Sequence, residues 1–164
     1  MFSYELFGAM SPALATDVVE FAHANDKKLY RATLEAVASV KKLRSVFLER
    51  QSRTDRNPII IAALKRPEMA MIADNLIRHW LLEKHGSMLG EFLNALGIPN
   101  NKGVVEQLPG SVGDAPLRTG VDTLLAKYPP EVVAVYLHAF NQFNQAGWSN
   151  LDAILKEDVR LMVG

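Results

Sequence analysis

Two polar side chains that could share a proton stand four residues apart in a largely apolar segment. His79 and Glu83 lie in the stretch 67–85, where Met, Ile, Leu and Trp recur around most of a helical circumference. On a helix, this spacing lets a carboxylate accept a hydrogen bond from an imidazole, orient the ring and raise its basicity. The same spacing is common in simple intrahelical pairs. His79 and Glu83 are therefore candidates either for a ligand site or for an ordinary structural pair.

Glu20 and His23 have the Glu-x-x-His spacing of metal ligands in carboxylate-rich helical bundles. Such a centre needs a second pair of this kind and two further glutamates, and the chain has only one pair. We therefore predict no metal site. Because cysteine is absent, thiolate metal sites, disulfides and cysteine nucleophiles are excluded. The glycine-rich segment 108–114 lacks the Lys-Ser/Thr of a phosphate-binding loop. We expect no cofactor and assign no catalytic residue.

Arg44 is the charged residue whose position is most unusual. If the helix that begins near residue 26 continues past residue 47, Arg44 projects between Val37, Val40 and Phe47 on the apolar side. An unpaired charge buried there would be costly. Arg44 is therefore predicted to form a buried ion pair, to line a pocket or to reach through an interface.

Basic charge is concentrated in the segment 26–56. It holds nine Lys and Arg residues against four Asp and Glu residues, whereas the whole chain is neutral with eighteen of each. The segment is thus +5 and the remainder −5, and such polarity is typical of chains that meet charged partners or their own copies. Four exposed-face residues are the interface candidates: Lys27, Lys28, Arg31 and Lys42.

The elements that must position these residues are helices. Ser-Pro and Asn-Pro pairs, a period of three and four in apolar residues, and terminal glycines recur, while strand patterns are absent. We predict a single all-α domain over 1–164, a bundle of seven or eight helices around a buried central helix at about 67–85. The other predicted helices cover about 12–24, the basic stretch from 26, 58–64, 88–96, 117–127, 130–145 and 151–162.

One long irregular loop, about 97–116, interrupts this pattern with four glycines and three prolines. Loops of this length in compact domains are usually functional or mobile. The hydrophobic content of 49% and charged content of 22% are those of a soluble globular protein. The sequence shows no signal peptide and no apolar run long enough to cross a membrane. We therefore expect a cytoplasmic protein without membrane contact.

Three functions are compatible with these observations. The first is a non-catalytic interaction module that forms a homodimer or binds an acidic protein partner, and it accounts for the charge polarity. The second is a small-molecule-binding protein or enzyme with an interhelical pocket near Arg44 and His79. The third is nucleic-acid binding through the basic segment 26–56, which the near-neutral isoelectric point of 6.9 disfavours. We favour the first, without enzymatic activity.

Overall fold

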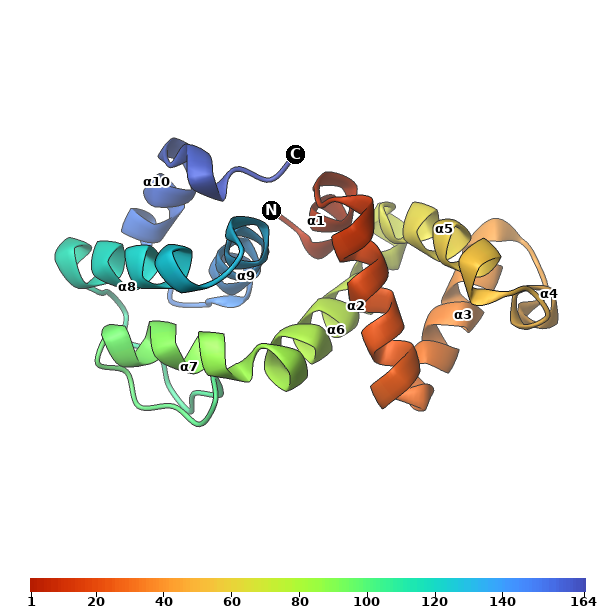
Figure 1. Cartoon of the computed structure of the whole chain (residues 1–164), viewed down its shortest axis with the longest axis horizontal. Helices are drawn as coiled ribbons and strands as arrows, with labels where there is room; N and C mark the ends of the chain where they lie inside the picture. Colours follow the sequence, from red (N-terminus) through yellow and green to blue (C-terminus); the bar gives the residue numbers. More distant parts are fainter. The chain divides into compact units, whose positions relative to one another are not determined.

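The computed structural model describes all residues from 1 to 164 and is all-helical, as the sequence predicts (Figure 1). It contains no β-strand, only one isolated bridge between Asn101 and Val104. The helices, including two 3-10 turns (η1, η3) and one π-helical turn (η2), are as follows: α1 Ser3–Ala9, α2 Pro12–Asn25, α3 Lys27–Lys41, α4 Ser45–Glu49, α5 Arg53–Leu64, η1 Pro67–Met69, α6 Ala70–His79, η2 Trp80–Lys84, α7 Gly86–Ala95, α8 Asp114–Lys127, α9 Pro130–Phe143, α10 Ser149–Glu157 and η3 Val159–Leu161.

The helices form two compact units, Phe2–Trp80 and Leu81–Val163, with the boundary inside η2. The prediction of one cooperative domain over 1–164 stays a prediction, which an unfolding experiment can test. In the N-terminal unit, α6 packs against α1, α2, α3 and α5, so it is the central helix of that unit. Its inward residues Ala73, Leu76 and Ile77 are fully buried, whereas Met71 is 76% exposed. The apolar surface of α6 is therefore buried on one side rather than all round.

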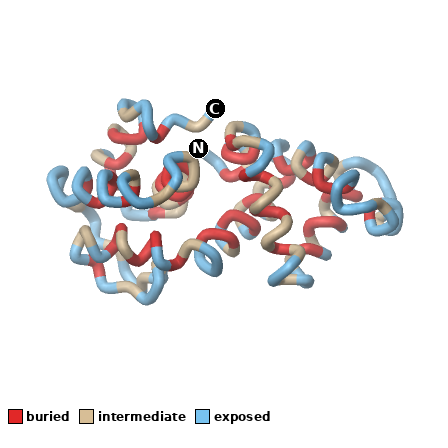
Figure 2. Tube along the Cα trace, in the orientation of Figure 1, coloured by how far each residue is buried: buried red, intermediate tan, exposed pale blue.

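In the C-terminal unit, α7 lies against α8, and α9 packs against α8, α10 and η3. Helix α9 buries more residues than α6 (Figure 2). Gly120 lets α7 and α8 approach closely, because a Cβ atom at this position would lie 3.2 Å from the Phe92 ring. Larger side chains at position 120 would push these two helices apart.

The prediction of one long basic helix from residue 26 is wrong, because the structure has two helices there, α3 and α4. Helix α3 ends at Lys41 because Lys42 adopts a left-handed backbone conformation with φ 55°. The Leu43 amide then donates to the Ala38 carbonyl at 2.8 Å and the Lys42 amide to Ser39 at 3.2 Å. This is the Schellman pattern that terminates helices. The chain turns there, forms the short helix α4, and starts again with α5.

Helix α5 also begins five residues before the predicted start at Pro58. Its N-cap is Ser52, whose hydroxyl accepts from the Asp55 amide at 3.2 Å and donates to the Asp55 carboxylate at 3.0 Å. The cap defines the start of α5, and Pro58, inside the helix, cannot donate a backbone hydrogen bond.

The loop between α7 and α8 covers residues 96–113 and contains no helical turn. Side chains hold it at several points. Asn100 donates to the Asn94 side chain at 2.9 Å and accepts from the Gly103 amide at 3.1 Å. Trp148 donates to the Pro109 carbonyl at 2.9 Å, and Asn150 to the Val112 carbonyl at 2.8 Å. The loop is therefore fastened both to itself and to the start of α10.

Candidate interaction surface and pocket

Three apolar side chains are exposed where the chain turns from α3 into α4, in a segment rich in basic residues. Leu43, Val46 and Phe47 are 41%, 47% and 51% exposed, while Leu48 on the same short helix is fully buried. Leu48 anchors α4 to the unit, which leaves its neighbours directed toward solvent. Figure 2 shows α4 and its flanking loops largely in the colour of exposed residues. Neighbouring large hydrophobic residues that remain exposed mark interaction sites more often than isolated ones do.

Basic side chains surround these three apolar residues. We define the α4 surface by the exposed residues Lys41, Lys42, Leu43, Arg44, Val46, Phe47 and Arg50. Glu49 is the only acidic residue in the segment 41–50. None of the four cations on this surface forms an ion pair within the chain. The α4 surface therefore combines uncompensated positive charge with apolar area.

The predicted interface residues are all exposed. Lys27, Lys28 and Arg31 lie on α3, and Lys42 forms the left-handed end of that helix. Lys42 thus belongs to the α4 surface, whereas the other three lie about three to four turns earlier along α3. Their exposure leaves them free to contact a partner, although exposure alone does not identify one.

The prediction that Arg44 forms a buried ion pair is wrong. Arg44 is exposed at the N-cap of α4, with extended backbone angles of φ −81° and ψ 139°. Because α3 ends at Lys41, the helical phase that placed Arg44 beside Val37 and Val40 does not reach it. Leu48 takes the buried position instead.

His79 and Glu83 have different surroundings and belong to different units. His79 is half-buried at the end of α6, where its ring centroid lies 5.1 Å from that of Phe21 and its Nδ1 atom is buried without a hydrogen bond. Glu83 is exposed in η2. A π-helical turn closes i→i+5 hydrogen bonds, so the i,i+4 register assumed for this pair does not hold there.

A polar cluster that the sequence did not single out joins α2 and α5. Glu20 accepts from Arg53 Nη1 at 3.0 Å and from Asn57 Nδ2 at 2.6 Å. The same Arg53 nitrogen lies 3.2 Å from His23 Nδ1. Since a guanidinium can only donate, Nδ1 is the acceptor in this contact. Glu20 and His23 thus bind an arginine, consistent with their use as structural partners rather than metal ligands.

Arg56 is the buried arginine of this unit, with 8% of its surface exposed. Its guanidinium carbon lies 5.3 Å from the centre of the Tyr30 ring, and its Nε atom has no hydrogen-bond partner. Burial raises the pKa of Tyr30, and the nearby positive charge of Arg56 opposes that rise. The His23 ring packs edge-on against Tyr30 with centroids 4.8 Å apart. Tyr30 therefore lies between a cation and an imidazole.

A pocket of about 380 Å³ opens beside His23 and Tyr30. It is formed by α2, α3 and α4 and is lined by His23, Lys27, Tyr30, Arg31, Leu34 and Glu49. We call it the α3 pocket, because four of its six residues come from α3. The four α3 residues are spaced three and four apart, which places them on one face of that helix.

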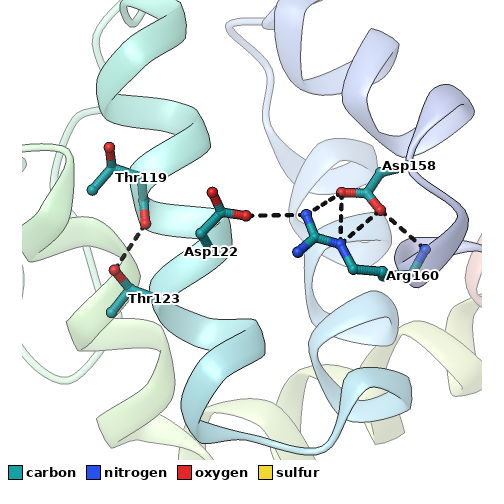
Figure 3. Close-up of polar contacts among 5 residues, drawn as sticks. All are labelled: Thr119, Asp122, Thr123, Asp158 and Arg160. Carbon is teal, nitrogen blue, oxygen red and sulfur yellow. Dashed lines mark hydrogen bonds and ion pairs between the residues drawn. The ribbon is translucent and has the colours of Figure 1, made fainter.

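One polar cluster of the C-terminal unit joins η3 to α8. Arg160 donates to Asp158 at 2.6 Å and to Asp122 at 3.0 Å, which ties η3 to α8 (Figure 3). The Thr123 hydroxyl donates to the carbonyl of Thr119 in the same view. The hydrogen bonds from Arg160 hold the pKa of Asp158 below its usual range. One guanidinium thus pairs with two carboxylates and ties the end of the chain to α8.

A hollow of about 640 Å³ lies against the loop 96–113, lined by prolyl, amide and valyl side chains with Glu106 as its one ionisable group. It offers no pair of groups for acid–base chemistry. The structure also contains no group of three or more His, Cys, Asp or Glu side chains placed to hold a metal ion. No helix combines the length and apolarity needed to cross a membrane.

Comparisons with known protein families, with curated proteins and with solved structures give no match to this chain.

Proposed function

We propose that this protein is a non-catalytic interaction module that binds an acidic, amphipathic segment of a protein partner through the α4 surface. The observation that carries the proposal is the exposure of Leu43, Val46 and Phe47 among four cations that have no partner in the chain. Apolar residues of a partner would cover these three side chains, and its carboxylates would meet the surrounding cations.

Apolar and electrostatic contacts have different roles in such a complex. Burial of aromatic and aliphatic side chains supplies most of the affinity, and a few central residues usually dominate it. Complementary charge accelerates association and selects the partner, and its effect weakens as salt screens it over about 8–10 Å. Phe47 is the expected central residue because it is the largest and most exposed of the three. The cations from Lys41 to Arg50 form the surrounding rim.

The direct test uses a labelled helical peptide with leucines on one face and glutamates on the other, titrated with the full chain by fluorescence anisotropy. Phe47→Ser is expected to weaken binding about five- to thirtyfold, corresponding to roughly 1–2 kcal/mol. Met71→Ser is the matched control, because Met71 is an exposed apolar residue of the same unit outside the α4 surface. Arg44→Glu should weaken binding more at low salt than at high salt, with Arg66→Glu as its control.

A peptide with the same composition but a scrambled order should bind weakly, because it has the charge without the apolar face. Equal binding of both peptides would show a purely electrostatic attraction and would contradict the proposal. Equal loss of affinity from Phe47→Ser and Met71→Ser would show that the α4 surface is not the binding site.

Self-association is the second candidate, and the distribution of charge between the units favours it. Twelve Lys and Arg against nine Asp and Glu give Phe2–Trp80 a formal charge of +3, and six against nine give Leu81–Val163 a charge of −3. Opposite units of two copies would therefore attract each other. Sedimentation at two protein concentrations and two salt concentrations tests this. Association should weaken with salt and be abolished by reversing Lys27, Lys28, Arg31 and Lys42 to glutamate, while helical content is retained.

A further inference from the structure

The α3 pocket is lined by charges of opposite sign that come from two helices. Lys27 and Arg31 lie on successive turns of α3, and Glu49 comes from α4. None of the three forms an ion pair, either with each other or elsewhere in the chain. Two cations and a carboxylate thus surround one opening without neutralising one another directly.

The inner part of the pocket is apolar. Tyr30 and Leu34 are only 7% and 4% exposed, and they occupy the turns of α3 between and beyond the two cations. Tyr30 is held by the Arg56 guanidinium and the His23 ring, so its position does not depend on a ligand. The Tyr30 hydroxyl is buried, and the Arg56 guanidinium is the side chain that approaches it. A volume of about 380 Å³ is in the range of small-molecule sites.

We propose that the α3 pocket binds a small zwitterion of the apolar α-amino acid class. Its carboxylate would lie against Lys27 and Arg31, its ammonium group against Glu49, and its side chain against Tyr30 and Leu34. A simple anion would be repelled by Glu49, and a simple cation by the two basic residues. Only a ligand that carries both charges next to an apolar group matches all three walls.

This site is separate from the proposed protein-binding surface, because none of its lining residues belongs to the α4 surface. The two proposals can therefore fail independently. Phe47→Ser, which should weaken peptide binding, is expected to leave amino-acid binding unchanged.

The test is an NMR titration of the full-length protein with three matched probes: L-leucine, 4-methylpentanoate, which lacks the ammonium group, and 3-methylbutylamine, which lacks the carboxylate. Leucine should shift the resonances of Tyr30 and Leu34. Each single-charge probe should bind about fivefold or more weakly than leucine, which corresponds to roughly 1 kcal/mol for one solvent-accessible charge pair.

Substitutions in the pocket identify which side chain contacts each charge of the ligand. Glu49→Gln should make leucine and 4-methylpentanoate bind equally, whereas Arg31→Gln should reduce the preference of the pocket for leucine over 3-methylbutylamine. Glu35→Gln is the control, since Glu35 is an exposed carboxylate of α3 outside the pocket. Tighter binding of 4-methylpentanoate than of leucine to the unmodified protein would show a plain anion site and overturn the proposal. Absence of any shift with all three probes would overturn it as well.

Discussion

Replacement of Arg56 separates two contributions of this side chain to the stability of the N-terminal unit. The apolar stem should stabilise the unit by packing, whereas the buried N–H without a partner should destabilise it. Arg56 is 8% exposed, stacks on Tyr30 and leaves its Nε atom without a partner. Arg56→Ala removes both the stem and the charge. Arg56→Met removes the charge but keeps most of the stem volume.

The structure lets the two effects be estimated. Loss of about three buried methylene groups costs roughly 2 kcal/mol at ~0.8 kcal/mol each. Loss of the cation–π contact costs up to about 2 kcal/mol, and removal of the unsatisfied N–H returns about 1–3 kcal/mol. Arg56→Ala should therefore lower the free energy of unfolding by roughly 1–3 kcal/mol. Arg56→Met keeps the packing, so it should stay within about 1 kcal/mol of the unmodified protein.

The assay is urea unfolding followed by tryptophan fluorescence in a Trp148→Phe background. The chain has two tryptophans, so Trp80, fully buried in the same unit as Arg56, becomes the only reporter. Arg44→Ala is the matched control, because Arg44 is exposed and unpaired. It should change the free energy of unfolding by less than about 0.5 kcal/mol.

Two results would refute this reasoning. Equal effects of Arg56→Ala and Arg44→Ala would show that the burial of Arg56 has no energetic consequence. A loss for Arg56→Met as large as that for Arg56→Ala would show that the charge over Tyr30, rather than the stem, provides the stabilisation.

Three further predictions concern the backbone, pH and cooperativity. Lys42→Gly should raise the free energy of unfolding by up to about 1 kcal/mol. A left-handed conformation costs a non-glycine residue ~1–2 kcal/mol, and glycine's greater freedom in the unfolded chain offsets part of that gain. As a control, Glu35→Gly, inside α3, should lower the free energy of unfolding by about 1 kcal/mol in the same urea assay. Burial lowers the pKa of His138, so the folded state binds fewer protons than the unfolded one, and stability should fall as pH drops below about 6.5. His138→Gln should reduce this dependence in a pH series of urea unfolding curves. If 1–164 is one cooperative domain, single-tryptophan variants that retain Trp80 or Trp148 should give coincident urea midpoints, and separate midpoints would contradict that prediction.

Local signals in the sequence were sufficient for most helix positions. Ser11 caps α2 through the Leu14 amide at 3.2 Å, with Pro12 at the first helical position, and Asp26 caps α3 through the Leu29 amide at 3.0 Å. These contacts join residues three apart, so they can be predicted without knowing the fold. The capping pair Ser52 and Asp55 is equally local, and recognition of its spacing would have placed the start of α5 correctly.

The identity of the buried arginine depended on tertiary structure. Helical periodicity predicts that one arginine of the basic segment lies inside, but it indicates Arg44 only if the helix continues beyond Lys41, where α3 in fact ends. Lysine does not signal a left-handed helix end as glycine does, so the end of α3 could not be recognised from residue types. Once the chain turns, the phase of α5 rather than that of α3 determines which arginine faces Tyr30, and that residue is Arg56.

The pocket and the α4 surface likewise depend on where separate helices pack. His23, Lys27 and Glu49 come from three helices, and no periodicity in the sequence relates Glu49 to the other two. Leu43 and Phe47 lie on the apolar side of the long helix that the sequence predicts, yet the turn at Lys42 and the burial of Leu48 leave them exposed. The sequence determined the helical class and the excess of basic charge because composition and three-to-four spacing are local properties. Only the tertiary structure decided which apolar and charged side chains remain exposed, since that depends on contacts between residues far apart in the chain.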